Sequence, residues 1–182
     1  MKRPTTTILF TLTSAMSGAC LFVPGVDAAS GFSPEALQTA FGQANDLKLI
    51  MSVAGIPEDG QQKLQTLFRQ QAASPTTIPL AEIGMDWSSS DAKIPNLPWG
   101  QHRFTAVSDS LIAIVFVTGG SDIRYNVILA PRHSPDFCLF NIPSLHESNL
   151  RLSVVQDYLR PDRDQTISST PKCVMVRGGN DD

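Results

Sequence analysis

The sequence predicts an α+β fold in which an N-terminal helical pair packs on an antiparallel β-sheet within a single domain. Apolar residues recur at helical spacing before residue 74, whereas runs rich in β-branched residues, separated by short polar turns, follow residue 102. A proline-rich segment divides these two parts. Because short turns join antiparallel neighbours, we expect the strands to form an antiparallel sheet.

Residues 1–28 have the pattern of a secretory signal peptide. Lys2 and Arg3 form a positively charged start, and an uncharged, largely apolar stretch follows them. Val26 and Ala28 are small residues at the two positions that a signal peptidase reads before its cut. The sequence therefore predicts cleavage after Ala28 and export of the remainder, to the periplasm of a bacterium.

An alternative reading of the same segment is a lipoprotein anchored through Cys20. Ser17-Gly18-Ala19-Cys20 resembles a lipobox, the bacterial signal whose cysteine becomes the lipid-modified first residue. The resemblance is loose, because a lipobox usually has an aliphatic residue in place of Ser17 and a polar tether after the cysteine. The stretch is also rich in Thr and Ser, which disfavours its retention in the membrane as an uncleaved anchor. After cleavage, no membrane insertion of the remaining chain is expected.

The first helix has a clear start. Ser33 is placed as an N-cap, Pro34 as the first helical residue and Glu35 in the first turn. Apolar residues at helical spacing follow, and this pattern is compatible with a helix as far as Val53.

A second helix is predicted from Glu58 to Ala73. Leu64, Leu67 and Phe68 form its apolar stripe among polar residues. The two helices are compatible with a helical hairpin. The stripe is expected to pack on the chain's own sheet, and the alternative is a groove for another chain.

Residues 74–101 are predicted to form a proline-rich connector. Prolines 75, 79, 95 and 98 punctuate the segment. We expect Trp87 and Trp99 to hold the connector against the core. Aromatic residues in a loop can also form a ligand platform, so both tryptophans are candidate contacts with a ligand or partner.

Strands dominate the second half of the sequence. They are expected at Arg103–Val107, Leu111–Thr118, Ile123–Ala130, Phe137–Ile142 and Lys172–Arg177. The second of these strands is apolar throughout, which is typical of a central strand that is covered on both faces. Residues 149–159 fit either a strand or a helix, and the Arg160-Pro161 pair favours a helix. Residues 178–182 are expected to form a disordered tail.

Cleavage after Ala28 leaves Cys138 and Cys173 as the remaining cysteines. In an oxidising compartment such a pair is expected to form a disulfide bond, which would place Lys172–Arg177 beside Phe137–Ile142. On the chain-entropy model this bond stabilises the fold by about 3 to 4 kcal/mol. The alternative is two buried, unreacted cysteines on neighbouring strands.

The strongest polar cluster lies in the turn from Arg132 to Asp136, which also contains His133. A proline-bounded turn explains this composition, but His133 and Asp136 could also serve an exported hydrolase as base and orienting acid. The sequence predicts no cofactor and no metal site, because its histidines are dispersed and it has no glycine-rich nucleotide motif.

The functional expectation is noncatalytic protein binding outside the cytoplasm, by an inhibitor, an immunity protein or an accessory factor of envelope assembly. The expected partner is another exported or envelope protein. The net charge of -3 without a basic cluster argues against nucleic acid as a partner. Arg132, His133 and Asp136 join the two tryptophans as candidate contacts. The alternatives are the hydrolase and a small-ligand carrier whose cavity has Trp87 or Trp99 at its mouth.

Overall fold

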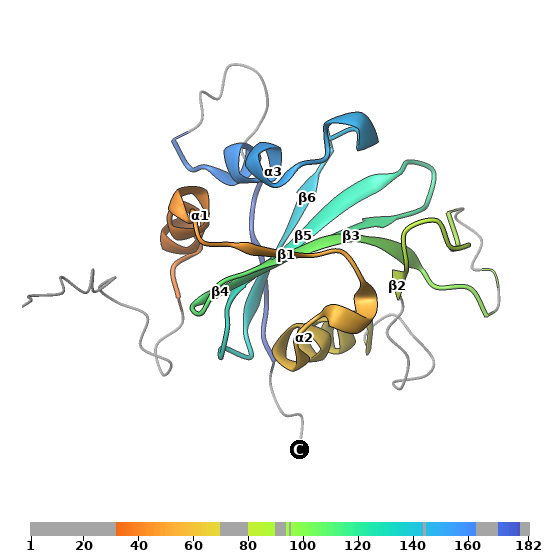
Figure 1. Ribbon diagram of the computed structural model, residues 1–182, viewed down its shortest axis with the longest axis horizontal. Helices are drawn as coiled ribbons and strands as arrows, with labels where there is room; N and C mark the ends of the chain where they lie inside the picture. The colour runs from red at the N-terminus through yellow and green to blue at the C-terminus, as the bar shows by residue number, and fades with distance from the viewer. Residues whose placement is uncertain are drawn as a thin grey trace, which may run out of the picture.

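The computed structural model describes residues 32–69, 80–89, 94, 96–143, 145–162 and 171–178. Both candidate export signals, and therefore Cys20, lie outside these residues. The described residues form an α+β fold in which helices cover both faces of a β-sheet (Figure 1). The strands are β1 (Lys48–Ile50), β2 (Leu80–Ala81), β3 (Gly100–Val107), β4 (Leu111–Thr118), β5 (Arg124–Pro131), β6 (Phe137–Ile142) and β7 (Val174–Val176).

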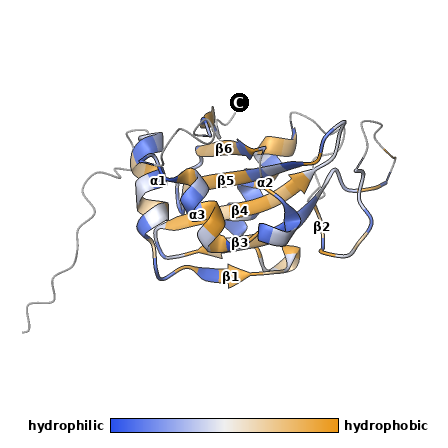
Figure 2. Cartoon of the chain, turned by 90° about the horizontal axis from the view of Figure 1, so that it is seen from above, coloured by the Kyte–Doolittle hydropathy of each residue, from blue (hydrophilic) through white to orange (hydrophobic). Residues whose placement is uncertain are grey.

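The sheet has seven strands among the described residues, and its order is β1-β3-β4-β5-β6-β7. All neighbours in this path are antiparallel, whereas the short β2 pairs with β3 in parallel. Viewed from above, β1 lies at one edge of the sheet and β6 lies near the other (Figure 2). The predicted antiparallel sheet is confirmed.

Strand β4 lies at the centre of the sheet between β3 and β5. Its residues from Leu111 to Val117 are all buried, as expected for a strand that is covered on both faces. Alternate residues enter two different core layers. Val115 packs in one layer with Phe104 and Val127, whereas Ile114 packs in the other with Ile128.

The helices are α1 (Pro34–Gln43), the 3-10 turn η1 (Val53–Gly55), α2 (Glu58–Arg69), the 3-10 turn η2 (Glu147–Asn149) and α3 (Leu152–Leu159). The predicted start of the first helix is confirmed, because the Ser33 hydroxyl accepts a hydrogen bond from the backbone N–H of Ala36 at 3.4 Å. The preference for helix over strand in residues 149–159 is also confirmed, by α3.

Helix α1 ends at Gln43, ten residues before the furthest end compatible with its sequence pattern. Ala44 has extended backbone angles (φ -70°, ψ 123°), and the chain then forms β1. Pairing between β1 and β3 joins residues far apart in sequence, and it overrides the helical spacing of residues such as Leu47. The second helix begins at Glu58 as expected, and residues 70–73 lie outside the described part of the chain.

The two N-terminal helices lie on opposite faces of the sheet (Figure 1). Leu37 and Phe41 of α1 pack with α3 in one core layer, so we call this side the α1/α3 face. Leu64 and Phe68 of α2 pack in the other layer, on the α2 face. The helical hairpin that the sequence allows therefore does not form, because β1 carries the chain along the sheet edge between α1 and α2.

A disulfide bond joins Cys138 to Cys173, as the sequence predicts. Their Cα atoms are 5.2 Å apart, and Cys138 in β6 is fully buried. The bond lies one residue before β7, which pairs antiparallel with β6. A second contact follows β7, where the backbone N–H of Gly178 donates to Asp136 Oδ1 at 3.0 Å. Residues 179–182 lie outside the described residues.

The described residues of the predicted connector include one short strand, β2, and the last two residues of the connector, Gly100 and Gln101, belong to β3. Trp87 packs in the α1/α3 layer, whereas Trp99 packs in the α2 layer and meets Phe68 edge to face, with ring centroids 6.4 Å apart. Among the described residues, none of the helices combines the length and apolar character that a bilayer crossing requires.

Candidate functional site

Two strands, β1 and β2, form the edge of the sheet beside β3, and their C-terminal ends point toward each other. We call this the β1 edge. Strand β1 is antiparallel to β3 and ends with Ile50 opposite Thr105. Strand β2 is parallel to β3 and ends with Ala81 opposite Gln101. Both pair with β3, so they run toward each other, and the β3 residues between them are 102–104. The chain turns away from the sheet after each strand.

A β-bulge in β3 lies where the two edge strands meet. His102 pairs with Phe116 and Phe104 pairs with Val115, so Arg103 is the extra residue. The bulge interrupts the alternation of side chains. His102 faces the α2 layer, as does Thr105, while Arg103 and Phe104 between them both face the α1/α3 layer.

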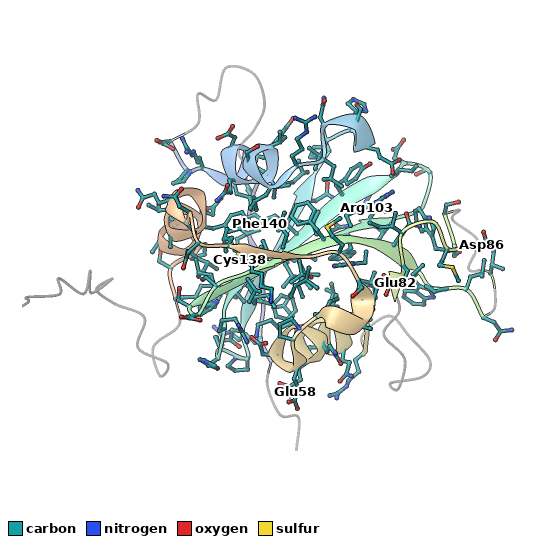
Figure 3. The ribbon with its side chains drawn as sticks, in the orientation of Figure 1. Glu58, Glu82, Asp86, Arg103, Cys138 and Phe140 are labelled. Carbon is teal, nitrogen blue, oxygen red and sulfur yellow. A yellow bond between two sulfur atoms is a disulfide. The ribbon has the colours of Figure 1, made fainter. Side chains whose placement is uncertain are left out.

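The segment from residue 44 to residue 53, which we call the edge run, contains β1 and ends at the first residue of η1. It is fixed at both ends by side chains from distant parts of the chain. At its start, Gln156 Nε2 of α3 donates to the carbonyl oxygens of Phe41 (2.9 Å) and Ala44 (3.0 Å). At its end, Glu82 Oε1 accepts the backbone N–H of Val53 at 2.8 Å. Figure 3 shows Glu82 beside η1, at the end of the edge run. These contacts hold the edge run straight along the sheet.

Large apolar side chains are exposed along this edge. Leu49 and Met51 of the edge run are 48% and 55% exposed, and Ile83 and Met85 in the turn after β2 are 48% and 63% exposed. The two groups are neighbours, because Glu82 holds Val53 and Gln101 Nε2 donates to the carbonyl oxygens of Glu82 and Met85, both at 3.2 Å. Clustered exposed apolar residues are typical of an interaction surface.

His102 is fully buried beneath the meeting point of β1 and β2. Its Nε2 lies 3.0 Å from the Thr105 hydroxyl, and its buried Nδ1 has no hydrogen-bond partner. Burial lowers the pKa of His102, because the charged ring loses its hydration, while the negative charge of Glu82 and the Met51 backbone act in the opposite direction. His102 is therefore a neutral structural residue at neutral pH.

Arg103 reaches over the other face of the sheet. Its NH1 group forms an ion pair with Glu147 of η2 at 2.6 Å, and its buried Nε has no hydrogen-bond partner. Tyr125 lies nearby, and burial raises the pKa of its hydroxyl. This ion pair ties the bulge to the segment that leads into α3.

Arg132, which the sequence nominates as a contact residue, connects two elements of the fold. Its Nε pairs with Asp59 Oδ2 of α2 at 2.7 Å, and its NH1 group donates to the carbonyl oxygen of Ser108 at 3.2 Å. Its own carbonyl oxygen accepts from Lys63 Nζ at 3.3 Å. Lys63 is buried, and the loss of hydration lowers its pKa. The side chain of Arg132 thus fixes α2 to the turn between β5 and β6.

His133 and Asp136 are not brought together by a hydrogen bond in the described part of the chain. His133 is exposed in the turn after β5. Asp136 Oδ1 accepts from Gly178, and the backbone N–H of Asp136 donates to Ser134 Oγ at 3.2 Å. The carboxylate therefore holds the segment after β7, and the geometry gives no support to the hydrolase alternative.

Trp87 and Trp99 pack in different core layers. Two surface depressions are lined in part by Arg160, one along α3 and one between α1 and the end of α3, and neither is lined by a tryptophan. No group of three metal-binding side chains occurs among the residues that the structure describes.

Sequence reasoning missed the residues that organise the β1 edge. Glu82 and Gln156 have no recognisable motif, because their partners are backbone groups at distant positions. A weak signal for β1 was present, since Leu49, Met51 and Val53 are apolar at every second position. In comparisons with known proteins, no family model, curated protein or solved structure matches this chain.

Proposed function

We propose that this chain is an exported, noncatalytic protein-binding domain that captures another exported or envelope protein at the β1 edge of its sheet. Export to a periplasm is part of the proposal, and the disulfide bond supports an oxidising compartment. An inhibitor, an immunity protein and an envelope-assembly factor all fit this description.

The observation that carries the proposal is the exposure of Leu49, Met51, Ile83 and Met85 along one edge. These side chains come from segments that are tied together by Glu82 and Gln101. A surface that is apolar and already ordered loses little conformational entropy when a partner binds. Arg132 and Asp136, two of the polar residues that the sequence nominates, form contacts within the fold.

The test is recovery of the mature protein with a stoichiometric partner from its native compartment, after crosslinking. Leu49→Asp and Met51→Asp should each reduce recovery of that partner at least about tenfold, because a charge at the centre of an interface must be desolvated without a partner. Recovery of the protein alone, with and without crosslinking, would refute the proposal.

Ile123→Asp provides a matched control. Ile123 is 60% exposed in the turn between β4 and β5, two strands that do not pair with β1, so the chemical change is the same at a similar exposure. Partner recovery should be unchanged in this variant. Equal losses from Leu49→Asp and Ile123→Asp would show that the β1 edge is not the binding surface.

A further inference from the structure

Strand β1 has a neighbour on one side only, since it is the first strand in the sheet order of the described residues. An edge strand presents backbone N–H and C=O groups that can accept another strand. β1 itself is three residues long, but extended angles at Ala44 and at Ser52 (φ -108°, ψ 146°) flank it. Figure 1 shows this part of the chain crossing the front of the sheet as one extended run from α1 to η1.

Acidic residues lie toward both ends of the edge run. Exposed Asp46 belongs to its first part, two residues before Lys48, and exposed Asp109 lies two residues after Val107, the partner of Lys48 in β3. At the other end, Glu82 holds Val53, and exposed Asp86 follows Met85. Figure 3 shows Glu82 and Asp86 on the same side of the molecule, with Asp86 further out in the loop. Lys48 is the one basic residue of the edge run.

We propose that the edge run binds an extended segment of a partner protein that adds to the sheet as a strand beside β1, with apolar residues at its centre and Lys or Arg at its two ends. This inference rests on the proposed function. The apolar centre of the segment packs against Leu49 and Met51, and its basic ends meet the acidic residues at the two ends of the edge run.

The preorganisation of the edge run favours this mode of binding. Gln156 and Glu82 already hold its two ends, so the backbone groups that receive the partner are ordered before binding. Backbone hydrogen bonds then provide affinity, and the charges at the ends select the orientation and class of segment.

A synthetic peptide, Lys-Lys-Val-Thr-Val-Thr-Val-Lys-Lys, serves as the probe, and amide hydrogen exchange of the full mature chain serves as the measurement. At saturating peptide, exchange in residues 44–53 should slow by about tenfold or more, because their outer amides become hydrogen-bonded. The same peptide with methyl groups on its central peptide nitrogens should give no protection. Equal protection by the methylated peptide, or protection elsewhere only, would overturn strand addition.

Two further experiments test whether the bound segment is basic. One uses a second peptide in which Glu replaces every Lys, and the other uses a double variant of the protein with a single-residue control. The Glu peptide should bind about tenfold more weakly at low salt. Asp46→Lys combined with Asp86→Lys should weaken the Lys peptide by a similar factor. Asp122→Lys, in the turn between β4 and β5, is the control and should change affinity less than about twofold. Equal affinities for the two peptides would overturn the basic character of the partner segment.

The outcomes separate this inference from the proposed function. A native partner that is recovered but does not compete with the Lys peptide would overturn the strand-addition mode and leave the binding function in place. If the peptide protected residues 44–53 but no native partner were recovered, the proposed function would be refuted and the strand-addition mode would be supported. Protection of residues 44–53 that rises with protein concentration, without peptide, would assign the edge to a second copy of this chain and overturn the proposal.

Discussion

The two edges of the sheet are secured by different kinds of contact. At the β7 edge, a covalent bond between Cys138 and Cys173 joins the last strand to β6, and the contact between Gly178 and Asp136 follows it. At the β1 edge, hydrogen bonds with the side chains of Gln156 and Glu82 hold the chain. The comparison shows that the terminal strand at one edge is tied covalently to its neighbour, whereas the strand at the other edge is held by hydrogen bonds without a covalent bond among the described residues.

Among the changes considered, removal of the disulfide bond should reduce the free energy of unfolding most. The double variant Cys138→Ala/Cys173→Ala should lose about 3 to 4 kcal/mol of unfolding free energy, since the unfolded chain regains the freedom of a loop that spans 35 residues. Chemical denaturation measures this loss. Exchange at the β7 amides should accelerate more than exchange at β1. If amide exchange accelerated equally at both edges, the disulfide bond would not act mainly on the β7 edge.

Loss of the hydrogen bonds at the β1 edge should have an intermediate effect. Glu82→Ala leaves the Val53 N–H without its acceptor and should cost about 1 to 2 kcal/mol. Glu82→Gln is the matched control, because its amide oxygen can still accept the bond. Hydrogen exchange should accelerate in residues 44–53 in the first variant and much less in the second. Identical behaviour of the two variants would exclude this role for the Glu82 oxygen.

Acidification should lower the free energy of unfolding in a defined pH range. The pKa of His102 is lowered in the folded state, so the unfolded chain binds more protons and stability falls as the pH drops below about 6.5. The slope is at most about 1.4 kcal/mol per pH unit. Denaturation of wild type and His102→Gln at about pH 7.5 and about pH 5 measures it.

The His102→Gln variant should show a smaller loss of stability on acidification than wild type. His133→Gln is the matched control, because it makes the same substitution at an exposed histidine. If His102→Gln and wild type lost the same stability on acidification, His102 would not be the group responsible.

The smallest effect on stability is expected from Leu49→Asp. Leu49 is about half exposed, and substitutions of exposed residues usually change stability by less than about 0.5 kcal/mol. Thermal denaturation should therefore place Leu49→Asp close to Ile123→Asp, although only Leu49→Asp is expected to reduce partner binding. A large loss of stability in Leu49→Asp alone would mean that this residue serves the core.

The central parts of the fold could be predicted because their signals are local. The N-cap at Ser33 and the uniformly apolar strand β4 are both visible within short segments of sequence. The disulfide pair followed from cysteine counting and an assumed oxidising compartment. The short turns between β3, β4 and β5 also predicted an antiparallel order.

The β1 edge could not be predicted in the same way. Ala40, Phe41, Ala44 and Leu47 keep a helical spacing, and only pairing with β3 makes the chain extended from Ala44 onward. The nominated site residues Arg132 and Asp136 were chosen for their chemistry, but their partners, Asp59 and Gly178, lie far away in sequence. Whether such a side chain supports the fold or contacts a ligand depends on these distant partners.

The head-on meeting of β1 and β2 limits the length of any added strand. A strand lying along the whole edge would be antiparallel to one of these segments and parallel to the other, since the two run in opposite directions along β3. Antiparallel and parallel ladders space their hydrogen bonds differently. One regular ladder therefore would not continue from β1 to β2, and a strand that adds to β1 in the proposed way would be no longer than the edge run.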